Sequence, residues 1–188
     1  MTQTQTQIVR PWPLCTWTDA SQLAAWIDRE KVPQASQGVA PSQWFATLRG
    51  EGKLFEAVSF LAHALPRYEC VLWATRTLIE TGVLNRGDPF ATAALRWIDD
   101  PSDRQRRAAG AVADDSGRAR AGEMLCQAVF YSGGSIAPPD LPAIQPPSHV
   151  CARMASGAVL TGAYADVAPS SAVFERAFAI GEALACGE

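Results

Sequence analysis

Three residue types that could carry out a reaction lie close together in the sequence: His63, Glu69 and Cys70. An imidazole that takes the proton of a thiol creates a nucleophile, and a carboxylate can serve as a general acid or base. His63 and Cys70 would have to meet across Pro66, and a third group would have to orient the imidazole. An enzyme that uses His63 with Cys70 or Glu69 is therefore one hypothesis. A histidine that hydrogen-bonds a helix end at the Pro66 turn explains His63 more simply.

Other patterns of reactive residues are weak. The stretch 131–135 (YSGGS) contains serines next to glycines, but it lacks the GxSxG pattern and a preceding strand that would hold a strained nucleophile turn. The histidines, His63 and His149, do not form a metal-binding pair, and the five cysteines are scattered without a CxxC motif. No glycine-rich phosphate loop is present. The sequence therefore predicts no catalytic residues, no metal and no cofactor.

Charged residues gather near the middle of the chain. The acidic pairs Asp99–Asp100 and Asp114–Asp115 fall at expected helix boundaries, where Asp is favoured as a capping residue. The arginines of this region are interleaved with acids, so we expect them on a solvated helix face; they are Arg104, Arg106, Arg107, Arg118 and Arg120. The net charge of −3 does not favour nucleic-acid binding.

The length of 188 residues and the hydrophobic fraction of 48% predict one globular domain with a substantial core. Residues 1–18 read as a polar N-terminal tail that ends in a Trp-rich part, which either docks on the body or binds a partner. Residues 19–188 read as a single α-helical domain. No apolar run reaches the roughly 18 residues of a membrane span, and the first residues lack a signal-peptide pattern. We therefore expect a cytoplasmic protein.

Hydrophobic periodicity predicts helices and no sheet. The clearest case is residues 54–65, whose apolar side chains recur at helical spacing, and no segment alternates with the period of a strand. Asp-Pro and Gly signals divide the chain into eight or nine helices, at about 19–30, 41–50, 54–65, 67–81, 89–99, 102–113, 118–131, 148–165 and from 170 onward. We expect a compact all-α array. Consecutive helix pairs suggest a repeat-like stack, although no fixed period is found.

Residues 132–147, the Pro-rich segment, interrupt this pattern. The segment holds five of the 13 prolines and two adjacent glycines, so neither a helix nor a central strand can run through it. Apolar residues recur among the prolines, which predicts an ordered extended strap laid across the helices rather than a linker. The residues expected to form an interaction surface are Ser132, Gly133, Gly134, Ser135, Ile136, Pro138, Pro139, Asp140 and Leu141.

Three sequence blocks carry a resemblance to a known family: FLAHALP at 60–66, RWIDDP at 96–101 and FYSGGSIAPP at 130–139. They resemble a bacterial family of unknown function with FLAxALP, RWVxDP and SGGSLAPP blocks. This chain departs from the pattern at Tyr68 and Tyr131. Members of that family occur near type VI secretion genes, so the resemblance implies a helical accessory or adaptor protein. It implies no catalytic residue, because the family has no assigned activity.

We therefore expect a non-enzymatic protein-interaction protein, an adaptor or chaperone for a bacterial type VI secretion effector or another protein of that apparatus. An alternative is an immunity protein that neutralises a co-encoded toxin. That alternative predicts an exposed acidic patch formed by Asp99, Asp100, Asp103, Asp114 and Asp115. The enzyme hypothesis with His63 is the third.

Overall fold

The computed structural model describes residues 9–114, 120–138 and 140–188. Within those ranges the chain forms nine α-helices and one short 3₁₀ helix, Gln34–Ser36, and no strand. The predicted all-α fold is confirmed. The helices are α1 Ala20–Ile27, α2 Pro41–Gly50, α3 Leu54–Ala64, α4 Arg67–Glu80, α5 Pro89–Asp99, α6 Asp103–Asp114, α7 Ala121–Phe130, α8 Val150–Ala163 and α9 Ser171–Ala185.

Three helices begin at a side-chain cap that the sequence contains. The side chain of Asp19 accepts the backbone N–H of Ser21 at the start of α1, and that of Asp88 accepts the N–H of Phe90 at the start of α5. Ser170 caps α9 in the same way. These side chains satisfy backbone donors that have no partner inside the helix, so they set where each helix begins.

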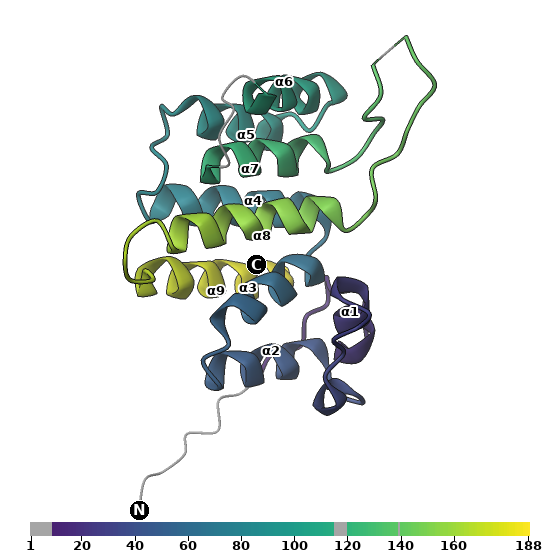
Figure 1. Ribbon diagram of the computed structural model, residues 1–188, viewed down its shortest axis with the longest axis vertical. Helices are drawn as coiled ribbons and strands as arrows, with labels where there is room; N and C mark the ends of the chain where they lie inside the picture. The colour runs from purple at the N-terminus through teal and green to yellow at the C-terminus, as the bar shows by residue number, and fades with distance from the viewer. Residues whose placement is uncertain (1–8, 115–119, 139) are drawn as a thin grey trace, which may run out of the picture.

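The helices stack in layers along the long axis of the molecule. Figure 1 shows α5, α6 and α7 at the top, α4 and α8 in the middle, α9 and α3 below them, and α2 and α1 at the bottom. Helix α8 packs against α3, α4, α7 and α9 and so lies at the centre. Trp73 of α4 is fully buried, and its indole N–H donates to the carbonyl of Ala177 in α9 at 2.8 Å. Nearly all buried apolar side chains of the described residues form one hydrophobic cluster.

Small residues let α8 approach its neighbours. A Cβ on Gly162 would lie 3.0 Å from side-chain atoms of both Leu78 and Val83, closer than such contacts normally permit. Gly157 leaves space in the same way for Met124 of α7. These two glycines therefore allow α8 to pack closely on its neighbours.

The Trp-rich part of the N-terminal segment packs on the helical body. Trp12 is only 7% exposed, and its ring centroid lies 5.2 Å from that of Phe45 in α2. The backbone N–H of Leu14 donates to the carbonyl of Ala185 at the end of α9. Residues 9–18 thus join α2 to α9. Across the ranges that the structure describes, every helix is too short or too polar to cross a bilayer.

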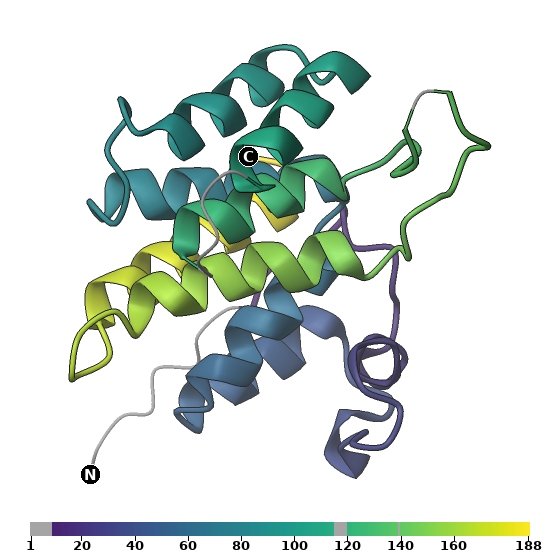
Figure 2. The same cartoon turned by 45° about the horizontal axis from the view of Figure 1, so that its top comes forward.

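The Pro-rich segment leaves the helical stack instead of lying across it. Figures 1 and 2 show the chain between α7 and α8 projecting beyond the ends of the helices as an extended loop. Residues 132, 133 and 135–137 are at least partly buried, but residues 140–145 are all exposed. We call residues 140–145 the apex. The expected strap across the body is wrong in this respect, because only the base of the segment finds partners on the stack.

Candidate functional site

The first turn of α6 places three charged side chains at the base of the Pro-rich segment. Ser102 precedes this helix; its hydroxyl accepts from the N–H of Gln105 at 3.4 Å and donates to Asp100 Oδ2 at 3.0 Å. The helix therefore begins at Asp103. Because residues three and four apart share a helix face, Asp103 meets both Arg106 and Arg107. We call these three residues the arginine clamp.

Arg106 is the buried member of the clamp, with 3% of its surface exposed. Its Nε and Nη2 donate to Asp103 Oδ1 at 2.9 and 2.6 Å, Nη1 donates to the carbonyl of Phe130, and Nη2 also donates to that of Ser135 at 2.7 Å. The guanidinium also lies 4.9 Å from the centroid of the Phe130 ring. The expectation of a solvated helix face is wrong for Arg106, which hydrogen-bonds the end of α7 and the Pro-rich segment.

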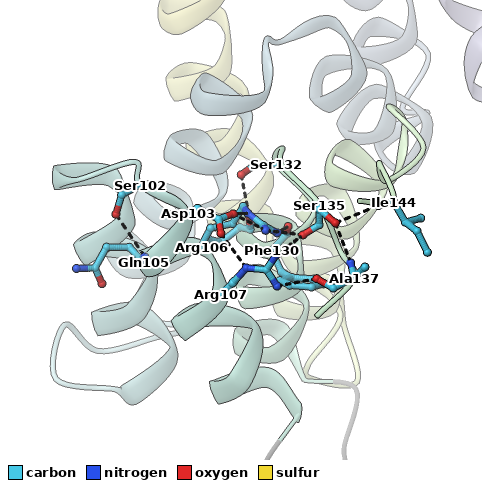
Figure 3. A network of polar contacts seen from close by, with 11 residues as sticks. Ser102, Asp103, Gln105, Arg106, Arg107, Phe130, Ser132, Ser135, Ala137 and Ile144 are labelled. Atoms are coloured by element: carbon cyan, nitrogen blue, oxygen red, sulfur yellow. Dashed lines mark hydrogen bonds and ion pairs between the residues drawn. The ribbon is translucent and has the colours of Figure 1, made fainter. Parts of the chain in front are cut away.

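Arg107 holds the next turn of the segment from the same helix face. Its Nη2 donates to the carbonyl of Ser135 at 2.9 Å and its Nη1 to that of Ala137 at 3.0 Å, while Nε pairs with Asp103 Oδ2 at 2.8 Å (Figure 3). Hydrogen bonds from Arg107, then from Arg106, hold the pKa of the Asp103 carboxyl below its ordinary value. The carboxylate thus orients both guanidinium groups, and they bind three backbone carbonyls.

The glycines and serines of the segment fit this clamp. Gly134 has a φ of +63°, and a Cβ there would lie 3.0 Å from Asp103 Oδ1 and 3.2 Å from Arg106 Nε. The hydroxyl of Ser132 donates to the carbonyl of Val129 at 2.7 Å and so closes the end of α7. The sequence SGGS is therefore explained as a tight turn against the clamp.

Ser135 and Ile136 draw the two limbs of the loop together. The Ser135 hydroxyl oxygen accepts from the N–H of Ala137 at 3.1 Å and from that of Ile144 at 3.0 Å. The N–H of Ile136 donates to the carbonyl of Ile144 at 2.8 Å. Beyond this closure the apex is free of the body: Leu141 and Ile144 are each 56% exposed.

The residues predicted to form the interaction surface thus divide into two groups. Those of the SGGS turn and Ile136 belong to the base, where backbone groups are bound by the clamp. Pro138, Asp140 and Leu141 are exposed. Pro139 lies outside the described residues. The exposed Ile144 belongs with this second group. It is one of the apolar residues that lie among the prolines, but it was not included in the predicted interaction surface.

The groups proposed for catalysis are not arranged as a nucleophile and a base. His63 Nδ1 donates to the carbonyl of Ser59 at 2.8 Å in its own helix, and no hydrogen bond joins His63 to Cys70 or Glu69 within the described residues. The Cys70 thiol is buried and interacts with the Cys151 thiol. The interaction with Cys151, and then burial, raise the pKa of Cys70 well above its ordinary value. Cys70 therefore holds its proton, and the geometry gives no support to the enzyme hypothesis.

Burial is also the main influence on the pKa of His63. It lowers the pKa of the imidazole, with smaller contributions in the same direction from Arg153 and His149, against the opposing effect of the Ser59 carbonyl. The Nε2 atom is buried and has no hydrogen-bond partner among the described residues. The ring is therefore neutral at pH 7.

The acidic patch expected for an immunity protein is divided between different environments. Asp99 and Asp100 are exposed at the end of α5, whereas both carboxylate oxygens of Asp103 are occupied by the clamp. Asp114 ends α6, and Asp115 lies outside the described residues. Asp103 is nevertheless exposed, with 58% of its side chain accessible, and the immunity hypothesis stays a prediction.

A second surface feature was not found from the sequence. A groove of about 430 Å³ lies between α1, α2 and α3. We call it the aromatic groove, because its apolar wall includes Trp44, Phe55 and Phe60 beside Ile27 and Leu48, while Lys31 and Lys53 line it as well. The groove combines residues from three helices, and the spacing within each helix alone gave no sign of it.

One family of known sequences matches most of the chain. A family model described as a family of unknown function, DUF6931, matches residues 44–185. The matched region extends from α2 to the end of α9 and includes the arginine clamp and the Pro-rich segment. No curated protein and no solved structure matches the chain.

Proposed function

Because the chain belongs to the DUF6931 family of unknown function, we propose from its own structure that it is a non-enzymatic protein-interaction protein. The apex of the Pro-rich segment is the surface that binds a partner protein. The observation that carries this proposal is an exposed apolar loop whose base is held by a buried arginine.

The energetic argument rests on the contrast between the base and the apex. Ordering a flexible loop on binding costs free energy, but the clamp, the Ser135 hydroxyl and the prolines already restrict this one. Leu141 and Ile144 are exposed in the free protein, and fully burying such a side chain contributes about 1.5–3 kcal/mol. A preorganised loop with two uncovered aliphatic side chains is suited to docking.

The partner we propose is an effector or another protein of a bacterial type VI secretion apparatus, for which this protein acts as adaptor or chaperone. The support for that choice is the resemblance of the FLAHALP, RWIDDP and SGGSIAPP blocks to a family whose members occur near such genes. The apex supplies the means of binding, and the resemblance supplies the class of partner.

Affinity purification from the bacterium that encodes the protein tests the proposal. Wild-type protein is compared with the double variant Leu141→Ser, Ile144→Ser and with the control Val167→Ser, which removes a fully exposed apolar side chain between α8 and α9. We expect a partner that wild type and the control retain and the double variant loses. Direct binding of the purified pair should weaken at least tenfold in the double variant. Equal affinity for all three proteins would contradict the proposal.

A further inference from the structure

The chain carries two exposed surfaces whose chemistries match each other. The apex is an aliphatic, proline-containing loop. The aromatic groove is a hollow of about 430 Å³ in which Phe55 is the exposed ring, while Trp44 and Phe60 are buried side chains of its lining. Extended proline-containing segments bind grooves lined by aromatic rings, because the rings stack on the flat, preformed chain at low entropic cost. Phe55 is 57% exposed, so a wall of the groove is open to a ligand.

We propose that the apex of one copy docks in the aromatic groove of a second copy of the same chain. This inference rests on the proposed function of the apex as a docking element and names a partner for it. Leu141 and Ile144 supply the apolar contact, and the exposed ring of Phe55 receives them.

Charge gives this contact its orientation. Asp140 is the only charged residue between Ile136 and Pro147, and no ion pair engages it within the described residues. The groove offers Lys31 and Lys53, whose side chains are 84% and 51% exposed. Asp28 and Glu56 line it too.

The existing partners of these lysines are replaceable. Lys31 lies 4.0 Å from Asp28, and Lys53 lies 2.7 Å from Glu51. Exposed ion pairs of this kind contribute about 0–1 kcal/mol. Either lysine can therefore exchange its acid for Asp140 at little cost.

The Pro-rich segment and α1 lie apart on the molecule. Figures 1 and 2 show the segment toward one end of the long axis and α1 and α2 toward the other. In a pair with twofold symmetry, the apex of each copy would contact the groove of the other copy. The result is a closed pair with two identical contacts, as isologous symmetry requires.

Sedimentation velocity over a range of protein concentrations tests the inference. Wild type and the control Val167→Ser should form a dimer, whereas Leu141→Ser in the apex and Phe55→Ser in the groove should each raise the dimer dissociation constant at least tenfold. Both changed side chains are exposed, so folding is preserved and is checked by circular dichroism. A wild type that is monomeric at every concentration overturns the inference, as does a dimer that neither change weakens.

A charge exchange distinguishes the proposed contact from any other dimer. Asp140→Lys should weaken the dimer, the double change Lys31→Glu, Lys53→Glu should weaken it too, and an equimolar mixture of the two variants should pair through the swapped charges. Absence of this rescue overturns the assigned contact. If wild type is monomeric but loses its cellular partner when the apex is changed, the inference fails and the proposed function stands. If the dimer depends on the apex but capture of the cellular partner does not, the inference stands and the proposed function fails.

Discussion

Gly134 is the residue at which the Pro-rich segment comes closest to the arginine clamp. Its φ of +63° is unfavourable for a residue with a Cβ, and that atom would also crowd Asp103. We expect Gly134→Ala to lower the free energy of unfolding by about 1–2 kcal/mol, measured by urea denaturation. Gly133 is the matched control, since its φ is not positive and a Cβ there meets nothing within 4 Å. Equal losses of stability in the Gly134 and Gly133 variants would show that contact with the clamp does not require glycine at position 134.

The cysteines provide a second test at the residue scale. Burial, with a smaller effect of Asp88, raises the pKa of the Cys126 thiol to about 12, and Cys70 and Cys151 are also buried. A thiol-specific reagent at pH 8 should leave these three unmodified in the folded protein and label them after denaturation. Cys15 and Cys186, which are partly exposed, should react first. Labelling of all five at one rate in the native state would contradict this assignment.

Burial of individual residues was predictable only where the helix pattern decided it. Cys70, Cys126 and Cys151 lie within apolar helical patterns, so their burial follows from local spacing. Arg106 was missed, because an arginine three residues after an aspartate looks like an ordinary surface pair. What buries it is the chain around Phe130 and Ser135, distant in sequence, and nothing within α6 reveals that contact.

At the scale of elements, the clamp joins α6 to the Pro-rich segment and to the end of α7. Arg106→Ala would remove the arginine donor to the carbonyl of Phe130, whereas the carbonyl of Ser135 keeps its hydrogen bond from Arg107. We expect a loss of about 1–3 kcal/mol in the free energy of unfolding, because one acceptor left unsatisfied costs about that much. Arg107→Ala should cost less, since its side chain is 27% exposed and water can replace it.

Hydrogen exchange separates loosening of the loop from general destabilisation. The amide of Ile144, which donates to Ser135 Oγ, should exchange faster in Arg106→Ala, whereas the amides of α9 should change only by the global loss of stability. Uniform change across the chain would count against a local clamp.

Element boundaries were predictable where a cap and a proline coincide, as at Asp88-Pro89, and where a proline opens a helix without a cap, as at Pro41. The Asp100-Pro101 signal predicted a helix from residue 102, and α6 begins one residue later, at Asp103, because the Ser102 hydroxyl accepts the backbone N–H of Gln105. The prolines predicted correctly that the segment 132–147 is not helical. They could not predict its direction, which depends on hydrogen bonds from Arg106 and Arg107.

For the whole molecule, His63 links stability to pH. Its pKa is lowered in the folded state, so the neutral ring is favoured there and the unfolded chain binds the proton more readily. Stability is therefore complete above the ordinary histidine pKa of about 6.5 and declines as the pH falls below it toward the folded-state value. Urea midpoints at pH 8, 6.5 and 5.5 should show this decline in wild type. The decline of the urea midpoint should be smaller in His63→Gln. An identical decline in both proteins would mean that groups other than His63 cause the loss of stability.

The overall fold was predictable as a class and not as an arrangement. The helix at residues 54–65 could be predicted because its periodicity depends only on the spacing of its own residues and not on the elements that pack against it. The aromatic groove depends on how α1, α2 and α3 meet, and the burial of Trp12 depends on its contact with Phe45. Such long-range contacts leave no mark in the spacing of a single helix.

The closure of the Pro-rich segment by Ile136 and Ile144 makes the residues between them an exchangeable module. Because the two limbs are joined at their base, the chain from Pro138 to Ala143 can differ in composition or length while α7 and α8 keep their places, and lengthening a closed loop costs little entropy. Replacing that stretch should transfer binding specificity between proteins that share the clamp, with melting temperatures unchanged. The helical stack would then act as a common carrier for recognition sequences that diversify independently of it.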